Sequence, residues 1–187
     1  MRLIKRSRLS RSLLAATLGM ALAGCASQPP MPTVEHVDLE RFMGTWYVIA
    51  NIPTFVERDA YNAIERYTLL PDGTIDTEFV FRKGGFDGER KRYNPRGFVR
   101  SDNNAEWGMQ FIWPIKAEFL VIHLDDGYSQ TVIGRTRRDY VWIMAREPHM
   151  DEADYAAIIA RLDELGYDID AIQRVPQRWP DERIESD

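Results

Sequence analysis

The sequence predicts an all-β protein, an eight-stranded antiparallel up-and-down barrel with one C-terminal helix packed outside it. Three observations support this fold class. Eight short apolar or alternating runs follow one another at near-regular spacing, turn residues separate them, and one late segment has helical periodicity. Eight short strands at near-regular spacing indicate a closed barrel, which leaves no exposed sheet edge.

The first three runs end at turn-forming residues. Strands are expected at residues 46–52 and 61–70, and Pro71-Asp72-Gly73 closes the second of them. Residues 75–82 alternate with a period of two, which predicts a strand with one solvated face, and Lys83-Gly84-Gly85 ends it. Five further strands are expected, at residues 89–99, 106–112, 118–124, 130–134 and 140–145.

One segment, residues 151–165, has the spacing of a helix. Its apolar side chains recur every three or four residues, at Tyr155, Ile158, Ile159, Leu162 and Leu165. Asp151 is the expected N-cap and Gly166 the expected C-cap. We expect this helix to pack on the outside of the barrel rather than to bind a partner. Residues 167–175 can supply a short last strand.

The N-terminal segment has the composition of a secretion signal. Five basic and no acidic side chains occur in residues 1–24, at Arg2, Lys5, Arg6, Arg8 and Arg11. The apolar run from Leu13 to Ala23 is shorter than the roughly 20 residues that span a membrane, but it suits the core of a signal peptide. Directly behind it lies Cys25, the only cysteine of the chain.

The stretch Leu22-Ala23-Gly24-Cys25 resembles the lipobox of bacterial lipoproteins. The resemblance implies cleavage before Cys25 and a diacylglycerol on its sulfur, with palmitate among the expected acyl chains. Each buried methylene contributes ~0.8 kcal/mol, so three chains would form a permanent anchor. The next residue is Ala26 rather than the aspartate of an inner-membrane retention signal, which predicts the outer membrane, on its periplasmic face.

Charge and composition define the rest of the chain. Loss of residues 1–24 would change the net charge from −5 to about −10, a surface that repels the phosphates of nucleic acids. Residues 25–34 contain three prolines and are expected to form an extended spacer. Residues 35–178 are the expected barrel domain, and residues 179–187 a polar tail. With a single cysteine, packing alone must hold this fold.

Three stretches resemble the lipocalins, and among them the bacterial outer-membrane lipoprotein lipocalins of the apolipoprotein D type. RFMGTWYVIANIP, residues 41–53, is similar to the family's Gly-x-Trp entry into the first strand. DDGYSQTVIGRTRRDYVWIMAREP, residues 125–148, is similar to the turn between two late strands and the strand that ends in arginine. FIWPIKAEFLVIHLD, residues 111–125, follows the aromatic-Pro pattern of the bacterial members.

The first two stretches contain the structural motif Gly44, Trp46 and Arg146. Gly44 allows a tight turn before the strand, and Trp46 supplies a large apolar plug for one barrel end. An arginine at a strand end is usually a surface charge, but the resemblance implies that Arg146 lies across the Trp46 indole. Such a contact contributes ~0.5–2 kcal/mol. These residues are expected to be structural rather than to contact ligand.

The inward faces of the strands are rich in aromatic side chains, as a pocket for an apolar ligand requires. Trp107, Met109 and Phe111 share one face of their strand by alternation. The expected ligand-binding residues are Phe55, Phe79, Phe81, Tyr93, Phe98, Trp107, Met109, Phe111 and Trp113. The resemblance implies a fatty acid or a lysophospholipid as the ligand. Arg66, Arg92 and Arg96 either offer a cation to its head group or face solvent.

The sequence gives little support to an enzyme. The three histidines, His36, His123 and His149, lack a metal-binding spacing, no G-x-S-x-G motif occurs, and a lipidated Cys25 cannot act as a nucleophile. No metal or cofactor is expected. The favoured function is an outer-membrane-anchored lipocalin that binds, stores or transports a lipophile, with a role in envelope maintenance. A filled, structural barrel and a lipocalin-fold enzyme remain as alternatives, and a homodimer stays open.

Overall fold

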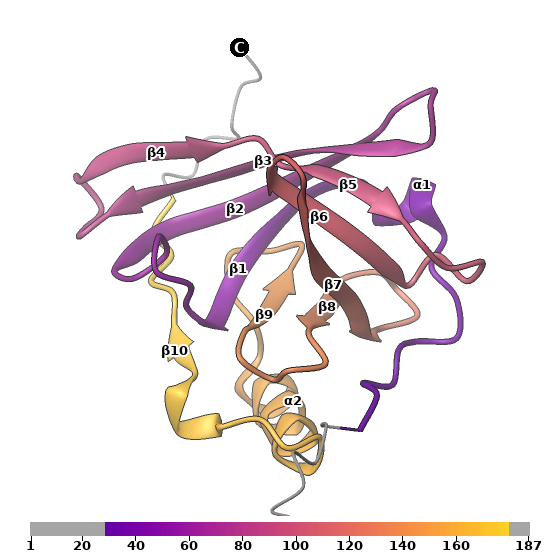
Figure 1. The fold of residues 1–187 in the computed structure, drawn as a ribbon. Coiled ribbons are helices and arrows are strands. Elements are labelled where there is room, and N and C mark those ends of the chain that lie inside the picture. Colours follow the sequence, from indigo (N-terminus) through magenta and orange to yellow (C-terminus); the bar gives the residue numbers. More distant parts are fainter. Residues whose placement is uncertain (1–28, 180–187) are drawn as a thin grey trace, which may run out of the picture.

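The strands form one antiparallel sheet that closes on itself as a barrel (Figure 1). The computed structural model describes residues 29–179, so the predicted signal segment, Cys25 and residues 180–187 lie outside the described residues. The first barrel strand pairs with the second on one side and with the last on the other, which closes the sheet. The predicted eight-stranded up-and-down barrel with one late helix is confirmed.

The order of elements follows the chain with few interruptions. The strands are β1 (Gly44–Ile52), β2 (Ala60–Leu69), β3 (Thr74–Lys83), β4 (Glu89–Tyr93), β5 (Arg96–Val99), β6 (Glu106–Ile112), β7 (Ile115–Leu124), β8 (Gln130–Gly134), β9 (Val141–Ala145) and β10 (Gln173–Arg174). The helices are α1 (Leu39–Phe42), α2 (Glu152–Glu164) and the short 3₁₀ helix η1 (Ile169–Ala171).

Two strands differ from the prediction. The expected continuous strand at residues 89–99 is wrong, because it divides into β4 and β5 at Asn94-Pro95, and both parts pair with β3. Proline has no N–H to give to a ladder, although the Pro95 carbonyl still accepts from Thr77 N at 3.2 Å. Strand β7 begins at Ile115, earlier than expected, because only two residues connect it to β6.

Helix α2 packs on the outer face of the barrel, as expected. Ile158 and Leu162 of the helix are buried in one hydrophobic cluster with Leu120 of β7 and Val132 of β8. A second cluster fills the barrel interior. Alternate residues of the strands therefore face two different cores, which explains why several strands have no solvated face.

The ends of α2 and the segment behind it refine the prediction. The Asp151 carboxylate accepts from Ala153 N at 2.8 Å, as an N-cap does. Leu165 is the C-cap, and Gly166 follows it in the left-handed region at φ +85°. The expected last strand is reduced to β10, since η1 occupies part of residues 167–175.

The described part of the expected spacer lies against the barrel rather than apart from it. Met31 is buried beside α2, and Val34 N donates to Val121 O at 3.0 Å. The strands, helices and hydrophobic clusters that the structure describes in residues 29–179 are all retained in a chain that begins at Ala26. Within that range, no helix has the length and apolar character needed to cross a membrane.

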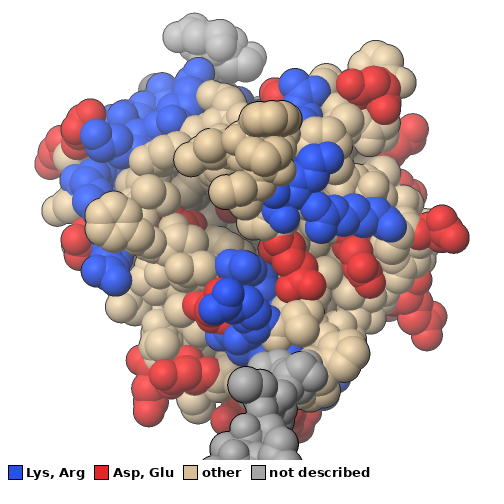
Figure 2. Space-filling view, viewed as in Figure 1, with Lys and Arg blue, Asp and Glu red and all other residues tan. Residues whose placement is uncertain are grey.

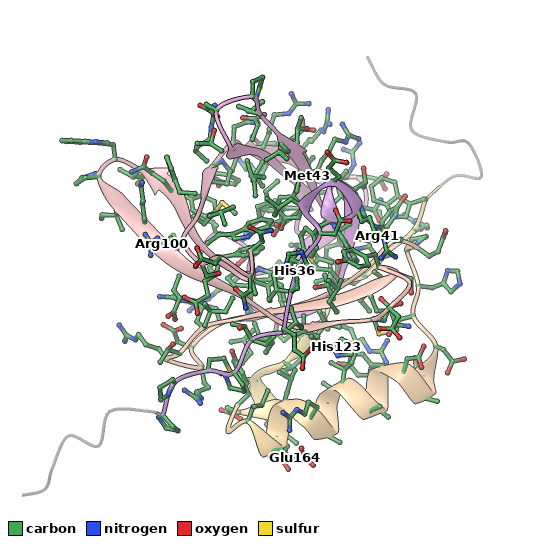
Figure 3. The ribbon with its side chains drawn as sticks, turned by 90° about the vertical axis from the view of Figure 1, so that its right-hand side faces the viewer. His36, Arg41, Met43, Arg100, His123 and Glu164 are labelled. Atoms are coloured by element: carbon green, nitrogen blue, oxygen red, sulfur yellow. The ribbon has the colours of Figure 1, made fainter. Side chains whose placement is uncertain are left out.

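The barrel has two distinct ends, because connections between antiparallel strands alternate from one end to the other. We call the end formed by α1 and the loops at residues 70–73, 100–105 and 125–129 the closed end. The loops at residues 53–59, 84–88, 113–114 and 135–140 form the open end. Figure 3 looks onto the closed end, with α1 and the labelled Arg41 and Met43 facing the viewer.

Candidate functional site

The closed end is sealed by the predicted motif residues. Trp46 is fully buried, and its Nε1 donates to Phe42 O at 2.9 Å. The Arg146 guanidinium carbon lies 3.8 Å from the Trp46 ring centroid. Gly44 has φ +94°, and an added Cβ would lie 3.3 Å from Arg146 Nη1, so both the turn and the close approach favour glycine here.

Arg146 also satisfies the backbone around it. Its guanidinium donates to five carbonyl oxygens, those of Arg41, Phe42, Met43, Thr45 and Tyr128, at 2.8–3.3 Å. Burial lowers the pKa of Arg146 to about 10. The side chain therefore remains charged at neutral pH while it holds α1 against the barrel.

Next to Trp46, an aromatic plug fills the barrel interior at the closed end. Phe42, Tyr67, Trp107 and Phe119 contact one another, with ring centroids 4.8–6.1 Å apart. Trp107 stacks on Phe119 at 4.8 Å, and its Nε1 donates to Asn104 O at 2.7 Å. The plug closes the barrel interior at this end.

Between the plug and the open end of the barrel lies a cavity of about 500 Å³, which opens toward the open end. This volume is within the range of small-molecule sites in proteins, about 300–1,000 Å³. Its wall is mostly apolar, and five of the nine expected ligand-binding residues belong to it. They are Phe55, Phe79, Tyr93, Met109 and Phe111.

The other four expected residues lie elsewhere. Trp107 belongs to the plug, Phe81 is buried against Phe79 and Tyr93, and Trp113 is 82% exposed beyond the cavity wall. Phe98 faces outward beneath Lys116 Nζ, which lies 3.3 Å from its ring centroid. Its neighbour Gly97 faces inward against Ile75 instead.

A common physical reason explains these differences. A period of two gives the face of a strand but not the depth along the barrel. The inward face of β6 begins in the plug, passes along the cavity wall and ends at the open end. The exposed fraction of its side chains rises from 0% at Trp107 through 5% at Met109 to 55% at Phe111. Tyr93 and Phe98 are an odd number of residues apart, and they pair with Phe79 and Thr74 of β3, which lie on opposite faces. The two side chains therefore point to opposite faces of the sheet.

A partly buried acid in the cavity wall, Glu65 of β2, was not predicted from the sequence. It lies between Ala63 and Tyr67 on the inward face, and the Tyr67 hydroxyl donates a hydrogen bond to Glu65 Oε2. Burial raises the pKa of Glu65 to about 7, and the hydrogen bond from Tyr67 offsets only part of this rise. The signal was available in the alternation of Ala63, Glu65 and Tyr67.

Two further acids at the cavity already have protein partners. The Glu57 carboxylate accepts from Trp142 Nε1 at 2.7 Å and from Thr54 N at 2.8 Å. The Glu118 carboxylate accepts from the backbone N and the hydroxyl of Thr136 at 2.6 and 2.9 Å. These acids hold the loops of the open end in place.

Among residues 29–179, Arg135 is the only basic residue that lines the cavity. Its Nη1 lies 3.4 Å from Asp139 Oδ1, and its Nε is buried without a hydrogen-bond partner among residues 29–179. An unpaired donor in a cavity wall can donate a hydrogen bond to an anionic or other accepting group of a ligand. The sequence analysis did not single out this residue.

The arginines that the sequence suggested as head-group cations are on the outside. Arg66 and Arg92 both pair with Glu78, at 3.2 and 2.9 Å, and Arg96 lies 3.6 Å from Asp76. None of the three lines the cavity. In the described part of the chain, no three His, Cys, Asp or Glu side chains are placed to hold a metal ion.

Sequence comparisons relate this chain to proteins from plants and bacteria. It is 30% identical to temperature-induced lipocalin-1 of Arabidopsis thaliana over 159 residues, which cover 79% of this chain and 83% of the relative. It is 28% identical to the outer membrane lipoprotein Blc of Escherichia coli (strain K12), with 87% of this chain and 93% of the relative covered.

Structural similarity agrees with the sequence comparisons. The barrel is similar to insecticyanin from the tobacco hornworm Manduca sexta, with a TM-score of 0.63 at 14% identity, covering 82% of this chain and 86% of that one. Residues 37–177 match the family described as lipocalin-like domain. This match includes the barrel, the closed-end motif and α2, and the chain therefore belongs to the lipocalin family.

Proposed function

We propose that this protein binds a single-chain lipophile, a fatty acid or a lysophospholipid, in its barrel cavity and acts as a carrier rather than as an enzyme. The observation that supports this function is the apolar cavity of about 500 Å³ with one basic side chain in its wall. Lipocalins are generally binding and transport proteins. The alternative, a structural barrel whose interior is filled by side chains, would not require a cavity of this size.

The cavity suggests how such a ligand would lie. The acyl chain would contact Phe79, Met109 and Phe119, where apolar burial contributes ~25 cal/mol per Å². The carboxylate or phosphate would accept a hydrogen bond from the Arg135 guanidinium, whose Nε has no hydrogen-bond partner among residues 29–179. Binding of this kind requires no catalytic group.

The proposal is tested by titrating the chain from Ala26 to Asp187 with a fatty acid and with a lysophospholipid. Tryptophan emission should change and saturate at one ligand per barrel. Met109→Asp, which places a charge in the wall, should weaken binding, whereas the matched control Met109→Leu should retain it. If neither lipid changes the emission or the melting temperature of the wild type, the carrier function is wrong.

The position of the head group has a separate test. Arg135→Gln should weaken binding of a fatty acid more than binding of the corresponding fatty alcohol, because only the acid presents a carboxylate. Arg96→Gln, on the outer surface, is the matched control and should change neither. Equal losses for acid and alcohol would show that the head group lies elsewhere.

We also propose that Cys25 is lipidated and that it anchors the protein in the outer membrane, on the periplasmic face, where a lipid carrier would serve envelope maintenance. The lipobox-like sequence supports this proposal, as does a relative named an outer membrane lipoprotein. Cys25→Ala should leave a soluble or unprocessed protein. If the variant stays in the outer-membrane fraction after a salt wash, the anchor is not at Cys25.

A further inference from the structure

The large exposed apolar side chains in the described part of the chain gather at one end of the barrel. In the range 29–179, the large hydrophobic residues that are exposed are Phe55, Val56, Phe111, Ile112, Trp113 and Ile115. The first two lie in the loop between β1 and β2, and the other four at the tip of the β6–β7 hairpin. Soluble proteins rarely expose contiguous apolar patches without a binding role.

This apolar rim continues the wall of the cavity outward. Phe55, Val56, Phe111 and Ile112 line the cavity, whereas Trp113 and Ile115 extend beyond it. Trp113 and Phe55 are 82% and 80% exposed. A ligand that left the cavity would therefore pass directly onto an apolar surface. Contact with a bilayer would bury this surface, whereas in solution it is exposed to water.

Basic side chains surround the rim although the chain as a whole is acidic. Exposed bases near the open end are Arg58, Arg82, Arg90, Lys116 and Arg137. Asp59, Asp87 and Glu89 are the exposed acids there, and Glu89 pairs with Lys91 at 2.7 Å. Figure 2 shows uncharged surface above and to the left of a central hollow, charged side chains below and to the right of it, and Lys and Arg gathered over β3 and β4. This distribution suits the anionic head groups of a lipid surface.

The chain also enters the domain at this end. Pro29 O accepts from Arg138 Nη1 at 2.7 Å, and Arg138 belongs to the same loop as Arg135 and Tyr140 of the cavity wall. Cys25 precedes Pro29 by four residues, a distance of at most ~14 Å in extended chain. A lipid on Cys25 would hold the domain close to the membrane at its open end.

We propose that the open end docks on a lipid bilayer, with the apolar rim in the boundary between head groups and acyl chains, so that the cavity opens into the membrane. Tryptophan is suited to this boundary because its ring is apolar and its N–H is polar. This surface would serve the lipid-carrier function proposed above, yet docking can be measured without any ligand in the cavity.

The test uses the chain from Ala26 to Asp187, which lacks both Cys25 and the signal segment, and vesicles of phosphatidylcholine with or without phosphatidylglycerol. The wild type should sediment with the anionic vesicles, and brominated acyl chains should quench its emission. Trp113→Asp should weaken vesicle binding roughly 10- to 100-fold. Trp113→Phe should retain binding but lose much of the quenching.

Two controls separate docking from other effects. Ala156→Asp adds the same charge on an exposed position of α2 and should bind vesicles as the wild type does. Trp113 does not line the cavity, so Trp113→Asp should retain fatty-acid binding and an unchanged urea melt. Vesicle binding without fatty-acid binding would overturn the carrier function alone, and fatty-acid binding without vesicle binding would overturn the docking surface alone.

A second copy of this chain is the competing occupant of the rim. Sedimentation velocity in the absence of lipid decides between them. A monomer that binds vesicles supports docking on the bilayer. A dimer that Trp113→Asp dissociates, together with no vesicle binding by the wild type, would show that the rim is a protein interface and would overturn the proposal.

Discussion

The two ends of the barrel place the same kinds of side chain, tryptophan and arginine, in opposite environments. At the closed end Trp46 is fully buried, and Arg146 donates to five carbonyl oxygens. At the open end Trp113 is 82% exposed, and the Nε of Arg135 has no partner among the described residues. One barrel therefore separates its roles along its axis. The closed end stabilises the fold, and the open end keeps exposed apolar side chains and an unpaired donor that suit binding.

Charge follows the same division. The closed-end loops carry Asp72, Asp102, Asp125 and Asp126, and the Asp125 carboxylate fixes its own turn by accepting from the backbone N–H of Gly127, Ser129 and Gln130. Exposed bases instead dominate around the apolar rim. In these closed-end loops Arg100 is the one base against four acids, so a negative membrane surface would attract the open end more than the closed one.

The largest effect on stability is expected at Trp46. Trp46→Ala removes a fully buried ring and the hydrogen bond to Phe42 O, and should cost about 3–5 kcal/mol in free energy of unfolding. Urea melts followed by circular dichroism measure this loss. A loss below about 1 kcal/mol would contradict the assignment of the closed end as the stabilising one.

Glu65 in the cavity between the two ends should make stability depend on pH. The folded pKa of about 7 exceeds the ordinary value of 4.5, so the native state binds more protons between these values and stability falls as pH rises through this window. Glu65→Gln should therefore stabilise the protein by up to about 3 kcal/mol above pH ~8, and little below pH ~5.

Urea melts of wild type and Glu65→Gln at both pH values provide the measurement. Glu147→Gln, at an exposed acid near the closed end, is the matched control and should leave the pH profile unchanged. A Glu65→Gln variant with the wild-type pH profile would show that the Glu65 carboxyl titrates normally.

The contact between Trp46 and Arg146 should appear as a smaller coupling energy. The Arg146 guanidinium lies 3.8 Å from the Trp46 ring centroid, which allows a cation–π contact. The double mutant with both residues changed to Ala should therefore lose about 0.5–2 kcal/mol less than the sum of the single mutants. A double-mutant cycle in urea measures this value. Strict additivity would mean that Arg146 acts through the carbonyl oxygens alone.

The smallest effect is expected at the open end. Trp113→Ser should change the free energy of unfolding by less than about 0.5 kcal/mol, because the ring has few contacts to lose. The same melts that report Trp46→Ala provide the comparison. A destabilisation similar to that of Trp46→Ala would remove the division between a stabilising and a binding end.

Much of the fold was predictable, because alternation and turn residues are local signals. The strand from Ile75 shows a period of two, Asp151 and Gly166 flank α2, and the Gly44, Trp46 and Arg146 motif occurs at recognisable positions. The break at Asn94-Pro95 also has a local signal, because a proline within a run argues against one continuous strand. Helix α1, four residues long, gives no periodic signal of its own.

The candidate site was predictable only in part. Periodicity placed Phe79 and Met109 on inward faces, where they line the cavity. It could not tell that Trp107 lies deeper, in the plug, or that Trp113 lies above, on the rim. Glu65 and Arg135 were missed because an acid in a strand or an arginine in a loop is usually a solvated charge.

The sequence by itself determined the antiparallel barrel, its late helix and the residues that seal the closed end, because period, caps and turn chemistry act over a few neighbouring residues. Only the tertiary structure decided where the aromatic plug stops and the cavity begins, since depth along the barrel depends on how strands are staggered against one another. It also decided that Glu65 and Arg135 face the cavity while Arg66, Arg92 and Arg96 face outward, because that choice depends on side chains brought together from distant strands.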